Sequence, residues 1–253
     1  MKMHIRKLAV LLLAIVWLLP AAAQDSQNIG TLVKITPKKG HSDELVEAIT
    51  EYHEWIADKE GAMRYNWYEV LTGPDTGLYY AWSGGHDWKD FDAEYDWQSD
   101  AGEMMRDKVM PHVEDMDRMM VRTMNNWSHW PEDWAGYTHF HLTDWYVNNG
   151  QNMAFRKGLM KIVSTLKAAD YSPRWGFHWM ESGTRGGHVV LVSPTKGWAG
   201  MTAPDTTFYD IMSKELGGEE AFETFMADWG KTFKTGATTT VEYMPGASDY
   251  GDD

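Results

Sequence analysis

Two stretches of the chain decide the fold: Arg64–Ala93 reads RYNWYEVLTGPDTGLYYAWSGGHDWKDFDA, and Arg174–Ala203 reads RWGFHWMESGTRGGHVVLVSPTKGWAGMTA. A shift of 110 positions aligns them without a gap, and their apolar runs and turn residues fall in register. The identical pairs are Arg64/Arg174, Gly73/Gly183, Gly77/Gly187, Ser83/Ser193, Trp88/Trp198 and Ala93/Ala203. Each copy is typical of a strand, a glycine-bounded turn, a second strand and a loop that enters a helix. A repeat of this size predicts two similar halves rather than a solenoid.

The residues around the first hairpin predict the rest of a half. Residues 31–37, TLVKITP, form a strand that Pro37 ends. A helix then follows, because apolar residues recur at helical spacing on one face: Leu45, Ala48, Ile49, Tyr52 and Ile56. After the hairpin we expect a helical region near Trp88–Val113 and a closing strand at Met119–Met124. The second half repeats this order, so the sequence predicts an α+β fold of two tandem β-α-β-β-α-β halves.

The N-terminal segment, 1–23, is predicted to be a signal peptide. A basic start precedes an apolar run from Leu8 to Leu19, and Ala23 suits cleavage before Gln24. We therefore expect a bacterial protein that is exported to the periplasm or beyond. The rest of the chain is expected to divide into a first half at 27–126, a Trp-rich linker at 127–136, a second half at 137–246 and an acidic tail at 247–253.

The chain is acidic and contains no cysteine. Its 253 residues carry a formal charge of −14, and cleavage after residue 23 would remove three positive charges and leave −17. Such a charge repels nucleic acid, so we expect no nucleic-acid partner. No stretch after the signal is long and apolar enough to cross a bilayer, so we expect no membrane insertion after cleavage. The lack of cysteine excludes disulfides, thiol nucleophiles and covalent haem attachment through CxxCH.

The element order, the glycine-bounded hairpin and the tandem repeat resemble the dimeric α/β-barrel (ferredoxin-like) superfamily. That group includes antibiotic-biosynthesis-type monooxygenases, stress-responsive A/B-barrel proteins and NIPSNAP-like domains. The resemblance implies two four-stranded sheets that face one another, with helices outside and a small pocket between the sheets. It also implies that a tandem chain forms the barrel internally, as a pseudo-dimer. Activities vary widely across the group, so the resemblance fixes no reaction.

Strand alternation indicates which side chains reach the inside of such a barrel. On the interpretation that Val33, Ile35, Phe140 and Leu142 face the helices, the inward residues are Leu32, Lys34, His139 and His141. His139 and His141 are two residues apart, a spacing that can supply two ligands to one metal ion. His178, His188 and Glu242 are the candidates for a third ligand. The alternative is that these histidines are polar linings of a wet pocket.

Aromatic residues at strand spacings of two predict a cleft for a flat, apolar ligand, although ordinary core packing is the alternative. The predicted ligand-binding residues are Lys34, Arg64, Trp67, Tyr80, Trp82, His139, His141 and His178, of which His139 and His141 are also the candidate metal ligands. The sequence indicates no catalytic residue and no particular cofactor.

Two main classes of function stay open. The first is a small-molecule pocket protein, either a binder or a cofactor-poor enzyme resembling an oxygenase. The second is an interaction or structural module, in which exposed linker tryptophans Trp127, Trp130 and Trp134 dock a partner. A metal-binding periplasmic protein is a further alternative, because methionines crowd residues 104–124 around His112 and could hold Cu(I), unless they are flexible core filler. A cavity lined by the strand residues would favour the first class.

Overall fold

Both repeated hairpins form as predicted in the computed structural model, which describes residues 28–248. The first pairs β2 (Asn66–Thr72) with β3 (Tyr79–His86), and the second pairs β6 (Gly176–Ser182) with β7 (His188–Thr195). The shift of 110 positions relates the bounds of β2 to those of β6. It also relates the first strand, β1 (Ile29–Pro37), to β5 (His139–Val147).

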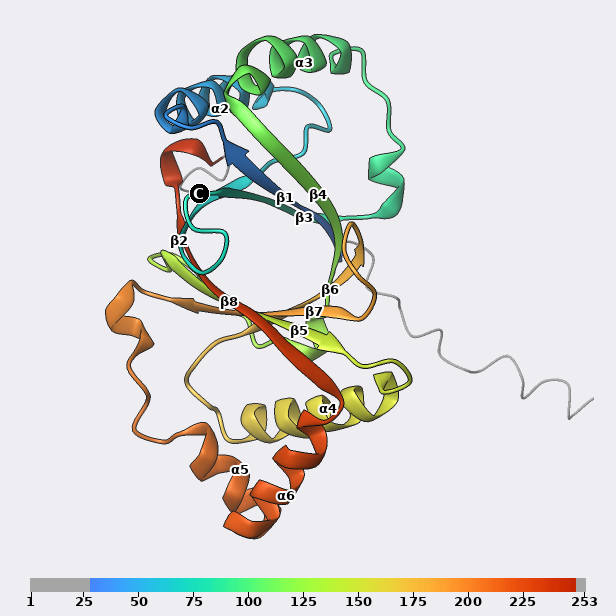
Figure 1. Ribbon diagram of the computed structural model, residues 1–253, viewed down its shortest axis with the longest axis vertical. Helices are drawn as coiled ribbons and strands as arrows, with labels where there is room; N and C mark the ends of the chain where they lie inside the picture. Colours follow the sequence, from blue (N-terminus) through green and yellow to red (C-terminus); the bar gives the residue numbers. More distant parts are fainter. Residues whose placement is uncertain (1–27, 249–253) are drawn as a thin grey trace, which may run out of the picture.

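The eight strands close into one antiparallel barrel in the order β1-β3-β2-β8-β5-β7-β6-β4 (Figure 1). The remaining strands are β4 (Val113–Thr123) and β8 (Phe233–Tyr243). Each half of the chain supplies four adjacent strands, and the two sets join where β2 pairs with β8 and where β4 pairs with β6. The expected sheets therefore meet along both edges, so neither set keeps an exposed edge strand.

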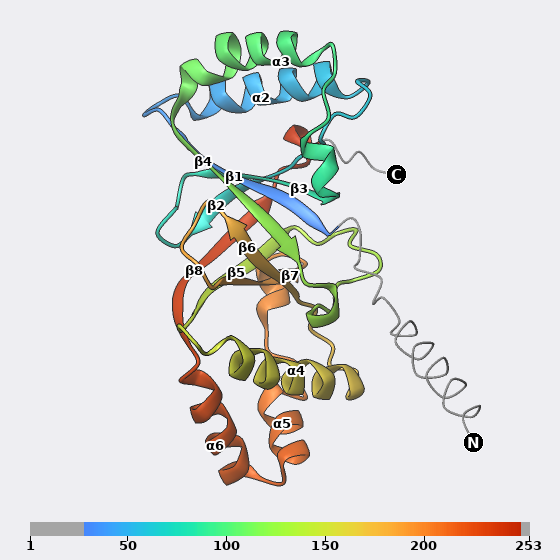
Figure 2. The same ribbon diagram turned by 90° about the vertical axis from the view of Figure 1, so that its right-hand side faces the viewer.

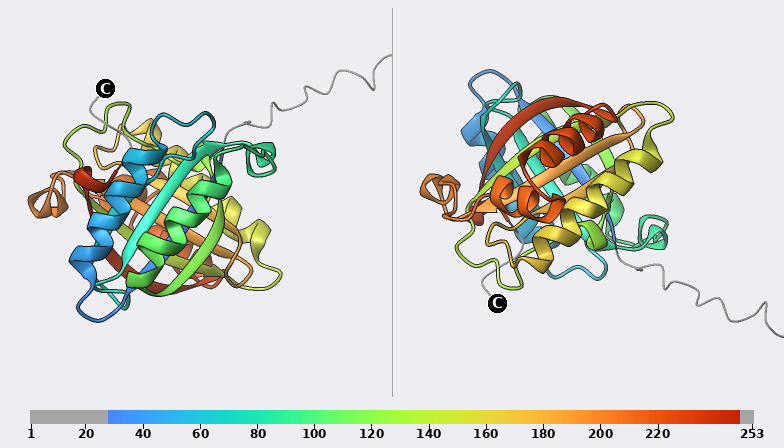
Figure 3. Two further views of the ribbon diagram at one scale, coloured as in Figure 1. Left: turned by 90° about the horizontal axis from the view of Figure 1, so that it is seen from above. Right: turned by 90° about the horizontal axis from the view of Figure 1, so that it is seen from below.

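Helices cover the barrel on two opposite sides (Figures 2 and 3). One side carries α2 (Ser42–Ile56) and α3 (Gln98–Met104), and the other carries α4 (Asn152–Ala168), α5 (Phe208–Leu216) and α6 (Glu219–Gly230). The apolar face predicted for α4 is buried, with Phe155 and Leu159 against the sheet. Among residues 28–248, no helix combines the length and the apolar character that crossing a membrane requires.

The second helical region of the first half is shorter than predicted at its start. Only a 3-10 turn forms at Trp88–Phe91, and the helix runs from Gln98 through a π turn and a 3-10 turn to His112. The closing strand β4 begins at Val113 instead of Met119. The reason is that β1 pairs with β4 along its whole length, from Ile29 opposite Arg122 to Pro37 opposite Val113.

Each half ends in a tail that packs on the other half. Met124 donates its backbone N–H to Phe177 O (2.8 Å), and Trp127 is buried in the helix–sheet core of the second half. In the same way, Met244 donates its backbone N–H to Trp67 O (2.9 Å), and Ala247 is buried in the core of the first half. The halves therefore complete one another's cores as well as the barrel. Of the tail predicted at 247–253, residues 249–253 lie outside the described residues, as does the predicted signal peptide.

The predicted orientation of β5 is wrong. Phe140 and Leu142 line the barrel interior, so His139 and His141 point to the outer face of the same strand. In β1 the predicted orientation is confirmed, with Leu32 inside and Ile35 packed in the core under α2. The predicted register of β5 was wrong by an odd number of residues. Because side chains alternate along a strand, such a shift moves every one of them to the opposite face.

Candidate functional site

The interior of the barrel is hollow. A cavity of about 510 Å³ lies inside it, and all eight strands contribute to its lining. The aromatic lining residues are Tyr68, Tyr80, Trp82, Trp130, Trp134 and Phe140, and the polar ones include Asn66, Thr123, Asn125, Ser128 and His178. The rest is mainly aliphatic, and among residues 28–248 no lysine, arginine, aspartate or glutamate belongs to this lining. A cavity of this size and character suits an uncharged small molecule.

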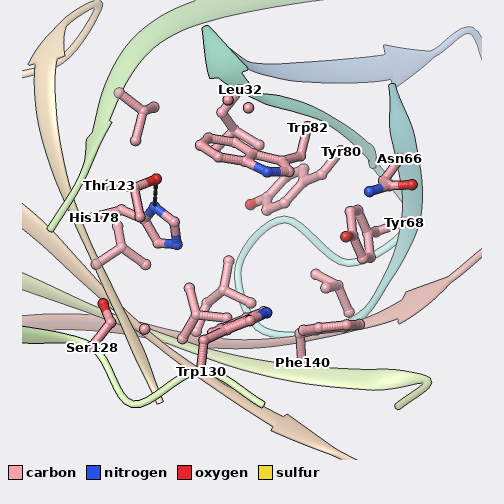
Figure 4. A pocket seen from close by; sticks show the side chains of 18 of the residues that line it. Leu32, Asn66, Tyr68, Tyr80, Trp82, Thr123, Ser128, Trp130, Phe140 and His178 are labelled. Carbon is pink, nitrogen blue, oxygen red and sulfur yellow. Dashed lines mark hydrogen bonds between the residues drawn. The ribbon is translucent and has the colours of Figure 1, made fainter. Parts of the chain in front are cut away.

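The aromatic rings lie on opposite sides of the cavity. In Figure 4, Trp82 and Tyr80 face Trp130 and Phe140 across the open space. Trp130 and Phe140 are stacked, with ring planes 16° apart and centroids 6.3 Å apart. Tyr68 meets Phe140 edge to face at 5.2 Å. These rings come from both halves and from the segment that joins them, so closing the barrel creates the aromatic walls.

Trp130 lies where the segment between the halves meets the cavity. The indole is 40% exposed, yet it also lines the cavity and packs on Gly176 of β6. A side chain at Gly176 would meet the Trp130 ring at 2.8 Å, so glycine is needed there for this close approach. Trp130 therefore forms part of the boundary between the cavity and solvent.

Within the described part of the chain, His178 on β6 is the one histidine that lines the cavity. Its Nδ1 lies 3.3 Å from Thr123 Oγ1, and its ring meets Trp82 edge to face at 5.1 Å. Burial lowers the pKa of His178 to about 4. At neutral pH the imidazole is thus uncharged, and it can offer either a hydrogen-bond donor or an acceptor to a molecule in the cavity.

Asn66, on β2, adds an amide to the lining, and the oxygen of that amide makes no hydrogen bond within residues 28–248. The residue is 6% exposed. Leaving a buried amide unpaired costs about 1–3 kcal/mol. This oxygen has almost no accessible surface, so Asn66 contributes to the cavity lining through its other atoms.

A charged network lies behind one wall of the cavity. Asp75, in the turn between β2 and β3, accepts hydrogen bonds from Lys34 Nζ (2.6 Å) and from the Tyr80 hydroxyl. Burial would raise the pKa of Asp75, but the hydrogen bonds from Lys34 and Tyr80 outweigh it and hold the pKa below its usual value. Burial and the Asp75 carboxylate together raise the pKa of Tyr80. Tyr80 therefore stays protonated and donates a hydrogen bond from its hydroxyl to Asp75, so its oxygen can still accept a hydrogen bond from a molecule in the cavity.

The predicted ligand-binding residues divide into two groups. Tyr80, Trp82 and His178 line the cavity, and Lys34 contacts it through Tyr80 and Asp75. Trp67 instead is buried under α2, where its Nε1 donates to His53 Nε2 at 3.0 Å. Arg64 is exposed and donates to Ala57 O.

The two histidines of β5 also lie outside the cavity. His139 packs against Trp198 at 5.0 Å, and His141 Nδ1 lies 2.8 Å from Thr240 Oγ1. His188, one candidate third ligand, pairs with Asp144 Oδ1 at 2.8 Å instead. Across residues 28–248 no three His, Cys, Asp or Glu side chains gather closely enough to hold a metal ion. A metal at His139 and His141 stays a prediction without a third protein ligand.

Four further residues line the cavity although they were not predicted from the sequence to do so: Asn66, Tyr68, Trp130 and Phe140. The sequence did contain a signal for Phe140. The shift of 110 positions aligns Leu32 with Leu142, so an inward Leu32 predicts an inward Leu142. Phe140 is two residues away on the same strand and therefore shares that face. Trp130 carried no such signal, since it follows the last strand of the first half. The linker tryptophans also differ from expectation: Trp127 is 5% exposed, so it is not available to dock a partner.

A second, smaller hollow of about 330 Å³ lies between the outer face of the second-half sheet and its helices. Apolar side chains such as Trp145, Leu159 and Phe177 line most of it, with Arg174 among the few polar ones. It contains no histidine and no carboxylate. The barrel cavity is larger and offers more hydrogen-bonding groups, so it is the stronger candidate site.

Comparison with known proteins places this fold among several solved structures. No family model matches the sequence, and no curated protein matches it either. A candidate monooxygenase from Lactobacillus acidophilus superposes with a TM-score of 0.53 at 11% identity, covering 86% of this chain and 94% of that one. An anthrone oxidase-like protein superposes with a TM-score of 0.51 at 12% sequence identity, covering 87% of this chain and 92% of that one. Chlorite dismutase from Candidatus Nitrospira defluvii, in complex with imidazole, also has a TM-score of 0.51. Its sequence identity is 8%, and the superposition covers 87% of this chain and 92% of that one. The likeness at these identities is one of fold.

Proposed function

We propose that the protein binds an uncharged, largely apolar small molecule inside the barrel. The observation that carries this proposal is the 510 Å³ cavity, whose lining combines aromatic walls with the neutral His178 and polar side chains such as Thr123 and Ser128. Cavities that hold small molecules commonly measure about 300–1,000 Å³ and present a few polar groups on apolar walls. A barrel that served packing alone would be filled by its own side chains, as small barrels are.

An uncharged fluorescent dye tests this proposal directly. We expect N-phenyl-1-naphthylamine to bind with one site per chain, and the anionic dye 1-anilinonaphthalene-8-sulfonate to bind more weakly, because the lining supplies no cation. Leu142→Trp fills the cavity and should abolish binding. Thr143→Trp adds the same bulk on the outer face of β5 and is the matched control. Equal binding by the two variants would contradict the proposal.

A second candidate function is cofactor-poor oxygenation of an electron-rich aromatic substrate in the same cavity. It is supported by the fold shared with a candidate monooxygenase and with an anthrone oxidase-like protein. His178 is the side chain placed to accept or donate a proton there. We expect oxygen uptake with anthrone to fall in His178→Gln while dye binding persists. No uptake by the wild type would leave a binding protein without this activity.

The interaction-module alternative has less support. Trp127 is buried, and Trp130 and Trp134 turn toward the cavity and the residues around it. Trp130 is still 40% exposed, but the most exposed indoles are those of Trp88 and Trp198, which occupy equivalent positions in the two repeats. A pull-down that depends on these two indoles, with no dye binding, would favour an interaction module.

We also propose that the protein is exported and that its halves are copies of one ferredoxin-like unit. Export is supported by the basic and apolar pattern of residues 1–23, and duplication by the 110-residue repeat. Mass spectrometry of the protein from the periplasmic fraction of its host should find a chain that begins at Gln24. A chain that retains residues 1–23 in the cytoplasm would contradict export.

A further inference from the structure

Two histidines far apart in the sequence meet away from the barrel cavity. His41 Nδ1 and His112 Nδ1 lie 3.2 Å apart, and the two rings are tilted by 41°. His41 immediately precedes α2, and His112 ends the 3-10 turn that leads into β4. Both side chains are partly exposed, so an ion could reach the two nitrogens from solvent.

The backbone holds these two residues together. Lys38 donates its backbone N–H to His112 O (2.8 Å), and His41 donates its own to Lys38 O (2.9 Å). The Lys38 ammonium also donates to Pro111 O (2.7 Å). One residue further in, Pro37 lies opposite Val113 in the ladder of β1 and β4. The two imidazoles thus stand on a rigid corner of the sheet, which lowers the entropic cost of bringing two ligands together.

We propose that His41 and His112 together bind a transition-metal ion of the borderline class, with Zn²⁺, Cu²⁺ and Ni²⁺ as its members. Two imidazole nitrogens on a tetrahedral ion, each at about 2.0–2.1 Å, are about 3.3 Å apart. The observed 3.2 Å is close to that spacing, so small side-chain rotations bring both lone pairs onto one ion. The strongly acidic chain favours the approach of cations.

The donor set distinguishes this site from the Cu(I) site considered for the methionine-rich segment. Met105, Met119 and Met124 pack into three different apolar clusters, so they do not gather around His112. Imidazole suits Zn²⁺, Cu²⁺ and Ni²⁺, whereas Cu(I) prefers thioether and thiolate ligands. Among residues 28–248 no third His, Cys, Asp or Glu joins the pair, so water completes the coordination. A single contact, between the two Nδ1 atoms, joins the imidazoles in this structure.

Calorimetric titration of the chelator-treated full chain with ZnCl₂ tests the site. We expect one ion per chain, with an affinity that falls at least about tenfold in His41→Ala and in His112→Ala. The double variant His139→Ala/His141→Ala removes the other close histidine pair and should bind Zn²⁺ as the wild type does. Circular dichroism and the melting temperature check that each variant is folded.

Electron paramagnetic resonance of the Cu²⁺-loaded wild type provides a readout that does not depend on any variant. We expect hyperfine splitting from two imidazole nitrogens. Absence of Zn²⁺ binding, a loss of binding confined to the His139/His141 variant, or a Cu²⁺ spectrum without two nitrogens would each overturn the proposal. Failure of this site would leave the barrel cavity and its proposed ligand unaffected.

Discussion

His178 links the cavity to the pH of the solution. Burial holds its pKa in the folded protein near 4, below the value of about 6.5 in an unfolded chain. As the pH falls, the unfolded chain therefore takes up the proton first. The stability that the neutral imidazole contributes is fully present above about pH 6.5 and is lost as the pH falls toward 4, by up to about 3 kcal/mol.

We expect His178→Gln to flatten this pH dependence. Glutamine keeps a polar group beside Thr123 and removes the titration. The free energy of unfolding in urea, measured at pH 7 and pH 4.5, should fall less in the variant than in the wild type. An identical fall in both proteins would show that His178 is not held neutral in the folded state.

Whether a predicted site residue lines the cavity depends on which face of its strand it occupies. Tyr80, Trp82 and His178 of the repeated hairpins line the cavity as predicted, whereas Trp67 of the same repeat faces α2 instead. His139 and His141 lie on a strand whose register no hairpin turn fixes in the sequence. The predicted register was wrong by an odd number of residues, so these side chains were expected on the opposite face of the strand. Asn66 and Phe140 show that the same repeat, applied along the whole chain, would have identified more of the lining.

At the scale of an element, α4 shows how closely a helix packs on its neighbours. Gly158 lies under Trp229 of α6, and a methyl group added there would overlap the indole. Trp229 Nε1 donates to Phe155 O at 3.0 Å, which fixes the indole in place. Helix propensity alone would favour alanine over glycine by about 1 kcal/mol. Packing outweighs that preference at this position.

We therefore expect Gly158→Ala to destabilise the protein by about 1–3 kcal/mol, the usual cost of overpacking. Gly102 in α3 is the matched control, because nothing lies within 4 Å of the position that its Cβ would take. Gly102→Ala should stabilise the protein by up to about 1 kcal/mol. Chemical denaturation measures both changes, and a stabilised Gly158→Ala variant would refute the close packing of α4 on α6.

The tails that follow β4 and β8 are the elements that sequence reasoning could not place. Trp127 and Ala247 are buried in the core of the opposite half, although Trp127 was expected in the linker and Ala247 in the acidic tail. The spacing of apolar residues predicts the strand or helix that contains them, but it says nothing of where a tail docks. Hydrogen bonds to Ser128 and Ser248 hold these two tails in place. Each serine hydroxyl accepts a backbone N–H from the other half, from Phe177 and Trp67.

The whole molecule is held together by pairing between its halves. The β2–β8 and β4–β6 ladders close the barrel, and the exchanged tails cover its outer cores. A half on its own would expose two strand edges and one face of its sheet, which favours aggregation or pairing with a second copy. The family resemblance implied that a tandem chain would form the barrel internally, while the closure along both edges emerged only from the structure.

We expect residues 25–130 expressed alone to form dimers or aggregates. Co-expression with residues 131–253 should restore a soluble one-to-one complex, because the missing edges and tail are then supplied. Size-exclusion chromatography with light scattering distinguishes these states. A soluble monomer of residues 25–130 with a cooperative melt would show that the halves are independent.

Native mass spectrometry of the protein purified from its own host shows whether the barrel cavity holds a small molecule. The wild type is predicted to carry a non-covalent mass of a few hundred daltons at one copy per chain, as a 510 Å³ cavity allows. The Leu142→Trp variant, purified in the same way, is predicted to lack it, and Thr143→Trp to retain it. A bare wild-type chain that also binds no uncharged dye, or an adduct that persists in Leu142→Trp, would contradict the account.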